Sequence, residues 1–367
     1  MAYDLSFENT KNAFAYKSDK ELRHARFLFS SMSYQTLVKI GTSLTPFIMK
    51  LGLPVKGLIR NTIFEQFVGG ESLDETAGVV DKLEKFNVNV ILDYGVEGKE
   101  GEESFEHSCE EFIRVVKYAS SQPNIPFISI KVTGFARFSL LEKLDAAAND
   151  HSGYTGNVHT EVLNDAEKEE WARVVERMER IIRAAANGNV AVLVDAEETW
   201  IQDPVDAVTM QMMEKYNRDR AVVYNTIQLY RSDRLAFLKH TYEEARKKNY
   251  IPAVKLVRGA YMEKERKRAA ELNYASPIQP DKASSDRDYN QALRFSIDNI
   301  AEIAVIVATH NEESNLYATK LMHEKEIPHN HLHIHFSQLF GMSDNITFNL
   351  ASEGYSVSKY LPFGPIK

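Results

Sequence analysis

Residues 190–197 read V-A-V-L-V-D-A-E, a run of five apolar residues followed by the acidic residues Asp195 and Glu197. A run this short and this apolar is typical of a strand that is buried on both faces of a parallel sheet. The residues on either side, 166–186 and 206–218, show the longer pattern of helices. A buried strand between two helices is the repeating unit of parallel α/β folds, so this stretch predicts such a fold.

The same pattern occurs eight times along the chain. Seven further apolar runs, each expected to be a strand, lie at residues 88–94, 127–134, 221–228, 253–261, 303–311, 331–336 and 356–360. A helix is expected after each of the first seven strands, among them residues 104–120, 233–248 and 315–325. Eight strand–helix units predict a closed (β/α)8 barrel. The alternative is an open doubly wound sheet, which is less favoured because no G-x-G-x-x-G follows an early strand.

The region before the first strand is expected to be mostly helical. Apolar residues recur at helical spacing in residues 18–32, 34–50 and 57–68. Ser72, with Glu75 three residues later, is typical of an N-cap with a capping box and predicts a helix that ends near Phe86. We therefore expect two parts, a helical region over residues 1–85 and a barrel over residues 86–367.

The composition sets limits on the partners and the compartment. The sequence holds 44 Lys+Arg and 52 Asp+Glu, so its formal net charge is −8. This charge disfavours a nucleic-acid-binding protein, because such proteins need a basic surface. The single cysteine, Cys109, cannot form an internal disulfide and suits a reducing compartment. No apolar run approaches the roughly 18 residues of a membrane span, and the first residues lack the features of a secretion signal.

Barrel enzymes place their active sites at the carboxyl ends of the strands, so polar side chains there are the candidates for chemistry. Lys131 and Lys255 lie within apolar runs, where an unpaired ammonium group would be costly. They form either two structural ion pairs or a cationic pocket for an anionic ligand. Gly259, in R-G-A-Y, would let a ligand approach the backbone closely. The polar candidates are Asp93, Lys131, Asp195, Glu197, Gln228, Lys255, Arg258, Tyr261, Thr309, His310, Asn311 and Tyr360.

Four histidines alternate at positions 329, 331, 333 and 335, and this spacing would place them on one face of the seventh strand. Three of them, His331, His333 and His335, have the chemistry of zinc ligands in a metal-dependent hydrolase. Metal sites in barrels also need ligands from other strands, and no H-E-x-x-H motif or cysteine cluster is present in the sequence. We therefore expect no metal.

Seven motifs, one for each strand from the second to the eighth, occur in the order found in one enzyme family. They are K-V-T-G (131–134), V-D-A-E-E (194–198), T-I-Q-L-Y (226–230), K-L-V-R-G-A-Y (255–261), A-T-H-N (308–311), Q-L-F-G-M (338–342) and K-Y-L-P-F-G-P (359–365). Through these motifs the sequence resembles the proline dehydrogenase family, in its monofunctional, eukaryote-like branch. It shows no aldehyde dehydrogenase module of the kind that the bifunctional bacterial members carry.

The resemblance implies a distorted (β/α)8 barrel that holds FAD without a covalent bond. It also implies oxidation of L-proline to Δ1-pyrroline-5-carboxylate, with the electrons passed to a membrane quinone through transient peripheral membrane contact. No base for the substrate amine stands out in the sequence, so solvent is expected to take its proton. The compartment would be the bacterial cytoplasm beside the inner membrane, or the mitochondrial matrix in a eukaryote. The lack of an Arg-rich, acid-poor transit segment favours the bacterial case.

The resemblance also implies roles for individual residues. Lys131 would bind the proline carboxylate, and Asp195 would orient that lysine. Tyr261 and Leu339 would pack against the proline ring. Tyr360 would lie over the C4 atom of proline, where a hydroxyl group would clash. The cofactor-binding residues that the resemblance implies are Gln228, Lys255, Arg258, Gly259, Ala260, Ser285, Asp286, Thr309, His310 and Asn311.

The sequence departs from the family pattern in two places. Lys255 and Arg258 stand where many bacterial members have Arg and Lys, which keeps the charge but changes the hydrogen-bond geometry. The family's last helix carries an Arg-Arg pair with Glu three residues later, and this chain ends at Lys367, before that helix. We therefore expect a barrel whose eighth helix is missing. Two other functions remain open: a Schiff-base-forming aldolase that uses Lys131 or Lys255, and a flavin-binding form with impaired catalysis.

Overall fold

The structure is a computed structural model that describes residues 5–32, 64–95, 100–148 and 156–365. Eight parallel strands form one closed barrel in sequence order, as the sequence predicts. The barrel closes where β8 pairs with β1, in a register that sets Ile91 against Tyr360. The strands are β1 (Asn89–Tyr94), β2 (Phe127–Ile130), β3 (Ala191–Val194), β4 (Val223–Gln228), β5 (Ala253–Val257), β6 (Ala304–Ala308), β7 (Ile334–Leu339) and β8 (Val357–Phe363).

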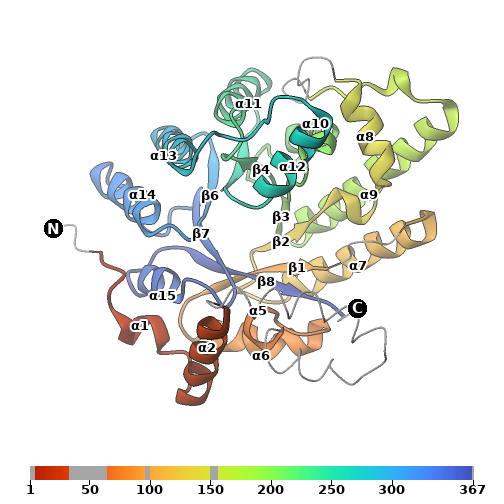
Figure 1. The fold of residues 1–367 in the computed structure, drawn as a ribbon. Helices are drawn as coiled ribbons and strands as arrows, with labels where there is room; N and C mark the ends of the chain where they lie inside the picture. The colour runs from red at the N-terminus through yellow and green to blue at the C-terminus, as the bar shows by residue number, and fades with distance from the viewer. Residues whose placement is uncertain (1–4, 33–63, 96–99, 149–155, 366–367) are drawn as a thin grey trace.

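Helices cover the outside of the barrel, and Figure 1 shows them arranged around the strands. A helix follows each strand from β1 to β7, which confirms the predicted alternation. The connections after β2 and β5 each hold an additional helix, α8 and α12. The helices are α7 (Glu102–Ser120), α8 (Phe138–Ala146), α9 (Asp165–Asn187), α10 (Thr199–Tyr216), α11 (Arg234–Lys248), α12 (Met262–Leu272), α13 (Lys282–Asp298), α14 (Glu312–Glu324) and α15 (Asp344–Ser352).

The apolar core has two parts, because successive residues of a strand point alternately into the barrel and outward. The outward residues, such as Val192 and Val305, pack with the helices in the larger part. Burial on both sides explains why the strands read as nearly continuous apolar runs. The inward residues form the smaller part, which consists of Ile91, Phe127, Ala191, Leu193, Tyr224, Ala253, Ala304 and Ile306.

Four helices precede the barrel in the described residues: α1 (Thr10–Phe14), α2 (Asp19–Met32), α5 (Glu65–Phe67) and α6 (Leu73–Glu84). The helix predicted over 18–32 is confirmed, whereas the helix predicted over 34–50 and most of that over 57–68 lie outside the described residues. Ser72 caps α6 as predicted, by accepting a hydrogen bond from the backbone N–H of Glu75. The capping box is incomplete, because the Glu75 carboxylate accepts from the backbone N–H of Glu71 and not of Ser72.

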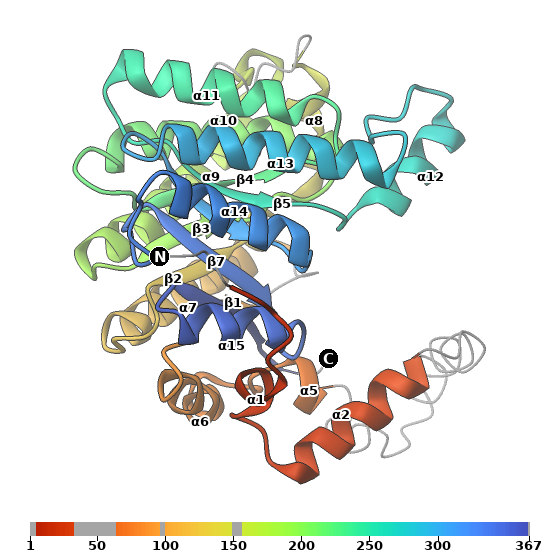
Figure 2. The ribbon, with the colours of Figure 1, turned by 90° about the vertical axis from the view of Figure 1, so that its left-hand side faces the viewer.

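The first helices dock on the barrel through α15. Figure 2 shows α1 beside α15, at the side of the barrel that β7 and β8 form. The Tyr16 ring stacks on Phe348 of α15 with a centroid distance of 4.3 Å, and the Tyr16 hydroxyl donates to Asp344 over 2.8 Å. The division of the chain at residue 85 stays a prediction.

The beginning of α10 differs from the sequence-based expectation. The predicted helix starts at residue 206, whereas the helix observed starts at Thr199 and contains Pro204. Side chains from neighbouring helices bind its first turn: the Glu265 carboxylate accepts from the backbone N–H of Thr199, and the Asp145 carboxylate accepts from that of Asp203. These partners lie far away in sequence, so local patterns could not predict where this helix begins.

Several strand predictions need correction at their ends, and those over 253–261 and 303–311 end already at Val257 and Ala308. The strand predicted over 127–134 ends at Ile130, and a 3-10 turn follows it. The strand predicted over 331–336 begins only at Ile334, because the preceding residues form turns. Of the four alternating histidines, only His335 therefore lies in β7, and the prediction that they share one strand face was wrong. Within the described ranges no group of three or more His, Cys, Asp or Glu side chains could hold a metal ion.

Candidate active site

A cavity of about 290 Å³ opens at the carboxyl ends of the barrel strands. Its wall includes all five residues to which the resemblance gives a substrate role, and five of the ten implied cofactor-binding residues. Three smaller side chains that sequence reasoning did not single out, Thr226, Ala308 and Ser337, also contribute to its wall. The predicted residues that line the cavity are Lys131, Asp195, Tyr261, Leu339 and Tyr360, together with Lys255, Arg258, Ala260, Thr309 and His310.

Asp195 is the centre of a buried ion-pair network inside the mouth of the barrel. One of its carboxylate oxygens accepts from Lys255, and the other accepts from the Tyr360 hydroxyl over 2.6 Å. Lys131 Nζ lies 3.7 Å from the second oxygen. The predicted pairing of Asp195 with Lys131 is present, but Asp195 holds Lys255 more closely. Both lysines are therefore ion-paired, as one interpretation of the sequence has it, and both line the cavity. That the cavity binds an anionic ligand stays a prediction.

The protonation states in this network follow from burial and charge. Burial acts against ionisation of Asp195, but the charges of Lys255 and Lys131 outweigh it and lower the pKa of this carboxyl group. Burial also raises the pKa of Tyr360, and the neighbouring charges of Asp195 and Asp93 raise it further. Tyr360 therefore stays a hydrogen-bond donor at neutral pH, and Asp195 stays a carboxylate.

Arg258, which directly follows β5, lines one side of the cavity. Its guanidinium group donates to Asp286 over 2.7 Å and to Thr309 over 3.1 Å, and it lies over the Tyr289 ring at 4.2 Å. The next residue, Gly259, has a φ of +99°, and a Cβ atom there would meet no atom within 4 Å. This conformation favours glycine and leaves the backbone open to a ligand.

Five of the implied cofactor-binding residues do not line the cavity: Gln228, Gly259, Ser285, Asp286 and Asn311. Four of them bind protein atoms instead, among them Asp286, which accepts from Arg258. Gln228 donates to the backbone oxygen of Glu197, the Ser285 hydroxyl donates to the backbone oxygen of Asp281, and Asn311 caps α14 by accepting from the Ser314 N–H. Their predicted contact with a cofactor stays a prediction.

Three titratable groups beside the cavity have pKa values far from their usual range. Burial raises the pKa of Glu197, which accepts a hydrogen bond from Thr133 over 2.7 Å, to about 7. Burial raises the pKa of Asp93 to about 6, with a further contribution from Asp195 and an opposing one from Lys131. Burial lowers the pKa of His310 to about 4, so its ring is neutral at pH 7. The sequence placed all three at strand ends but gave no role to Asp93 or Glu197.

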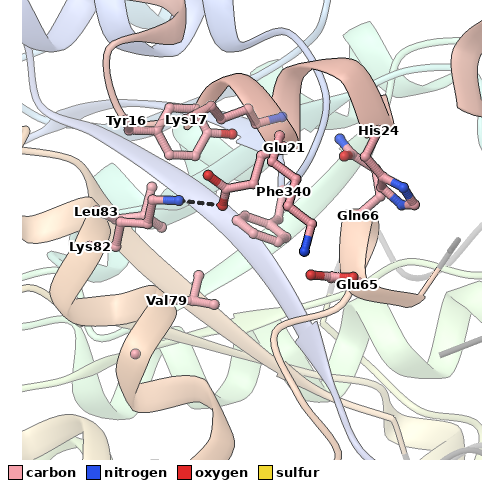
Figure 3. A pocket seen from close by; sticks show the side chains of 12 residues that line it. Tyr16, Lys17, Glu21, His24, Glu65, Gln66, Val79, Lys82, Leu83 and Phe340 are labelled. Atoms are coloured by element: carbon pink, nitrogen blue, oxygen red, sulfur yellow. Dashed lines mark hydrogen bonds and ion pairs between the residues drawn. The ribbon is translucent and has the colours of Figure 1, made fainter. Parts of the chain in front are cut away.

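A second cavity, of about 640 Å³, lies between α2, α5 and α6. Figure 3 shows its wall, where Lys82 and Glu21 form an ion pair of 2.6 Å. Phe340 lines this cavity, whereas the preceding residue, Leu339, lines the first one. The loop after β7 therefore separates the two cavities.

The closed barrel, with an ion-paired cavity at the carboxyl ends of its strands, has the architecture of (β/α)8-barrel enzymes. The chain belongs to the proline dehydrogenase family, whose model matches residues 77–367. This membership confirms the resemblance read from the seven motifs. No helix in the described part of the chain is long and apolar enough to cross a membrane.

Named relatives extend this result. The chain is 32% identical over 350 residues to "Proline dehydrogenase 1, mitochondrial" of Dictyostelium discoideum, which covers 87% of this chain and 61% of that protein. It is 30% identical over 387 residues to "Hydroxyproline dehydrogenase" of Xenopus laevis, which covers 99% of this chain and 83% of that protein. The chain thus spans less than two thirds of the length of the Dictyostelium relative.

A solved structure supports the fold. Proline utilization A from Bdellovibrio bacteriovorus, inactivated by N-propargylglycine, superposes with a TM-score of 0.71 and 20% sequence identity. The match covers 98% of this chain and 36% of that protein. At this identity the likeness shows the barrel fold alone.

Proposed function

We propose that this protein oxidises L-proline to Δ1-pyrroline-5-carboxylate, with FAD as the cofactor and a membrane quinone as the electron acceptor. The observation that carries the proposal is that Lys131, Tyr261 and Tyr360 line one cavity at the barrel mouth. An ammonium group, two aromatic rings and apolar walls match a small ring that carries a carboxylate. Family membership supports this activity.

On the substrate side, Lys131 would bind the carboxylate of proline. Its side chain is 20% exposed and lies between Asp93 and Asp195, which hold the ammonium group in place. Leu339, 42% exposed, supplies apolar contact for the proline ring. The Tyr360 hydroxyl is fixed by its bond to Asp195, so the ring has little freedom to move away from a hydroxylated substrate.

On the cofactor side, the residues present fit a flavin in two respects. Lys255 and Arg258 bring positive charge to the cavity, and such charge stabilises a reduced, anionic flavin. Gly259 leaves the backbone open where a bulky cofactor would approach. When bound, the flavin supplies the acceptor for the hydride of the substrate. The work of this chain is to hold the proline ring close to the flavin and to balance its charge.

The aldolase alternative is less well supported. A lysine that forms a Schiff base must lose its proton before it attacks a carbonyl carbon. Lys131 lies within 4.0 Å of two carboxylates and Lys255 donates to Asp195, so both side-chain nitrogens are engaged in ion pairs. These contacts favour binding roles for both lysines.

The proposal is tested with purified protein loaded with FAD. We expect the visible absorption of bound flavin to bleach when L-proline is added without oxygen, and to return when a short-chain quinone is added. Mass spectrometry should then identify the cyclic imine product. A protein that takes up no FAD would overturn the proposal. A protein that binds FAD but is not reduced by proline would instead be the flavin-binding form with impaired catalysis.

A membrane quinone as acceptor would require transient contact of the protein with a membrane surface. The Dictyostelium relative is named as mitochondrial. Sedimentation with quinone-containing vesicles, with and without L-proline, tests this contact directly.

A further inference from the structure

One carboxylate in the barrel mouth has no role in the proposed reaction. Asp93, at the end of β1, lies with its Oδ1 atom 4.0 Å from Lys131 Nζ. The other groups that face it are Asp195 from β3, Lys255 from β5 and the Tyr360 hydroxyl from β8. Lys131 and Asp195 line the cavity, whereas Asp93 does not. A ligand can therefore reach Lys131 without displacing Asp93.

The two carboxylates are held differently. Asp195 binds Lys255 and the Tyr360 hydroxyl and lies 3.7 Å from Lys131. Among the described residues, Asp93 has one ion pair, the longer one to Lys131. Burial accordingly raises the pKa of Asp93 to about 6, whereas the lysine charges overcome burial and lower the pKa of Asp195. As the pH falls from neutral, Asp93 is the first of the two to gain a proton.

The difference in pKa between Asp93 and Asp195 matters for ligand binding because a ligand changes the charge around them. Among the described residues, two ammonium groups and two carboxylates meet here, and their charges cancel when all four are ionised. A carboxylate ligand at Lys131 brings a third negative charge close to Asp93. Repulsion between like charges favours protonation of the more weakly held carboxylate, and protonated Asp93 no longer competes with the ligand for Lys131.

We propose that Asp93 takes up one proton whenever a carboxylate ligand binds to Lys131. This inference rests on the proposed function, which makes L-proline the ligand. The proton comes from solvent, because Asp93 does not line the cavity. An O–H bond of a hydronium ion or a buffer acid breaks, and an O–H bond forms on Asp93. The protonated carboxyl group offsets the negative charge that the ligand brings, so binding of a carboxylate ligand weakens as the pH rises above neutral.

The test measures protons and does not depend on turnover. The FAD-loaded protein is titrated with cyclopentanecarboxylate, a ring acid that resembles proline in size but has no amine to supply a proton. Calorimetry in two buffers of different ionisation enthalpy gives the number of protons taken up per ligand bound. At pH 7 we expect close to one proton for the wild type, and a Kd that rises about tenfold between pH 7 and pH 8.

The decisive variant is Asp93→Asn, which keeps the shape of the side chain but cannot ionise. We expect it to take up no proton and to bind the ring acid with a Kd that does not change between pH 7 and pH 8. The visible spectrum of the bound flavin and the Tm report whether its fold is intact. Asp93→Glu restores a titrating carboxyl group and should restore proton uptake.

Glu197→Gln is the matched control, because Glu197 is the other carboxyl group beside the cavity with a raised pKa. It should take up as many protons as the wild type. Binding without proton uptake, equal uptake by Asp93→Asn, or loss of uptake in Glu197→Gln would overturn the inference and leave the proposed function intact. Failure of the wild type to bind the ring acid would overturn the proposed function together with the inference.

Discussion

At the scale of single residues, the two lysines of the barrel mouth have the same charge but different surroundings. Lys131 is 20% exposed and borders the cavity, whereas Lys255 is 6% exposed and donates to Asp195. Under the proposed function, removal of Lys131 removes a group that binds the ligand, whereas removal of Lys255 leaves a buried carboxylate with less positive charge around it. The pair therefore separates substrate binding from stability.

We predict that Lys131→Met mainly weakens proline binding and that Lys255→Met mainly lowers stability. Lys131→Met should raise the KM for proline about 10- to 150-fold, the equivalent of one charge-assisted hydrogen bond of about 1.5–3 kcal/mol. Lys255→Met should lower the free energy of unfolding by about 3 kcal/mol, because Asp195 loses its closest partner. Steady-state kinetics and urea denaturation measure the two quantities. Equal KM values for Lys131→Met and the wild type would contradict the substrate role of Lys131.

Glu197 gives a pH-dependent prediction. Its pKa is about 7 in the folded protein, raised by burial from the ordinary value of 4.5. The unfolded chain releases this proton near pH 4.5, so the group lowers the stability of the folded protein as the pH rises from about 5 to 8. Glu197→Gln avoids this loss and keeps an acceptor for Thr133. Relative to the wild type, the variant should gain at most about 3 kcal/mol between pH 5 and pH 8. A difference that does not change with pH in thermal unfolding would refute the assignment.

The sequence predicted residues of the site where it predicted the ends of strands, because the site lies at the carboxyl ends of the barrel strands. Lys131, Asp195 and Lys255 stood out because charges in apolar runs need partners. The ion pairs themselves could not be predicted, because they depend on the barrel register and on side-chain reach. Asp93 was visible as a strand-end residue, but only its distance to Lys131 shows that two carboxylates share one lysine.

At the scale of elements, the loop after β7 begins directly after Leu339, which lines the cavity. Gly341 in this loop has a φ of +78°, and its backbone oxygen accepts from the Gln66 side chain over 2.9 Å. A Cβ atom at this position would lie 2.1 Å from the backbone oxygen of Gln66. Backbone of α5 therefore fixes the loop, and only glycine fits.

We predict that Gly341→Ala loses about 2–4 kcal/mol of stability, from the positive φ and the clash together. Gly354→Ala is the matched control, because Gly354 has a φ of +80° but open space within 4 Å. It should lose only about 1 kcal/mol. Urea denaturation gives both values. Gly341→Ala should also weaken binding of the ring acid, since Leu339 lies only two residues before Gly341. Equal losses of stability in the two variants would contradict the clash.

A buried ion pair joins α15 to the barrel and to the first helices. Lys359, on the outer face of β8, is fully buried and lies 2.9 Å from Asp344. Asp344 also binds the Tyr16 hydroxyl and lies 3.1 Å from Lys17. One carboxylate therefore connects the barrel wall with the N-terminal helices.

We predict that Lys359→Met lowers the free energy of unfolding by about 3 kcal/mol, because Asp344 remains buried with less positive charge around it. Lys82→Met, which breaks the exposed pair with Glu21, should cost less than about 1 kcal/mol. Comparable losses in chemical denaturation would show that the burial of Lys359 has no energetic consequence.

The elements differed in how well the sequence predicted them. Strands were identified because burial on both faces leaves a continuous apolar run, as at Ala191–Val194. The beginning of α10 was misplaced because a tertiary partner sets it, since Glu265 binds its first turn. The beginning of β7 was misplaced because local turns occupy the histidine-rich segment before Ile334. Propensity carries no information on such partners.

At the scale of the whole molecule, the question is whether the N-terminal helices and the barrel unfold together. Cys109, the single cysteine, reports on the barrel from α7. It is fully buried, its Sγ atom lies 3.6 Å from the backbone oxygen of Arg177, and burial raises its pKa to about 11. A thiol reagent should therefore modify it only when the barrel opens.

We predict that Tyr16→Ala, which removes the stack on Phe348 and the bond to Asp344, accelerates modification of Cys109 about 150-fold. That factor corresponds to a loss of about 3 kcal/mol, typical for a buried aromatic ring, if both parts unfold as one unit. Val305→Ala, in the barrel wall, must accelerate the reaction in any case and serves as the positive control. An unchanged rate in Tyr16→Ala, with a reduced helical signal in circular dichroism, would instead show that the N-terminal helices unfold independently of the barrel.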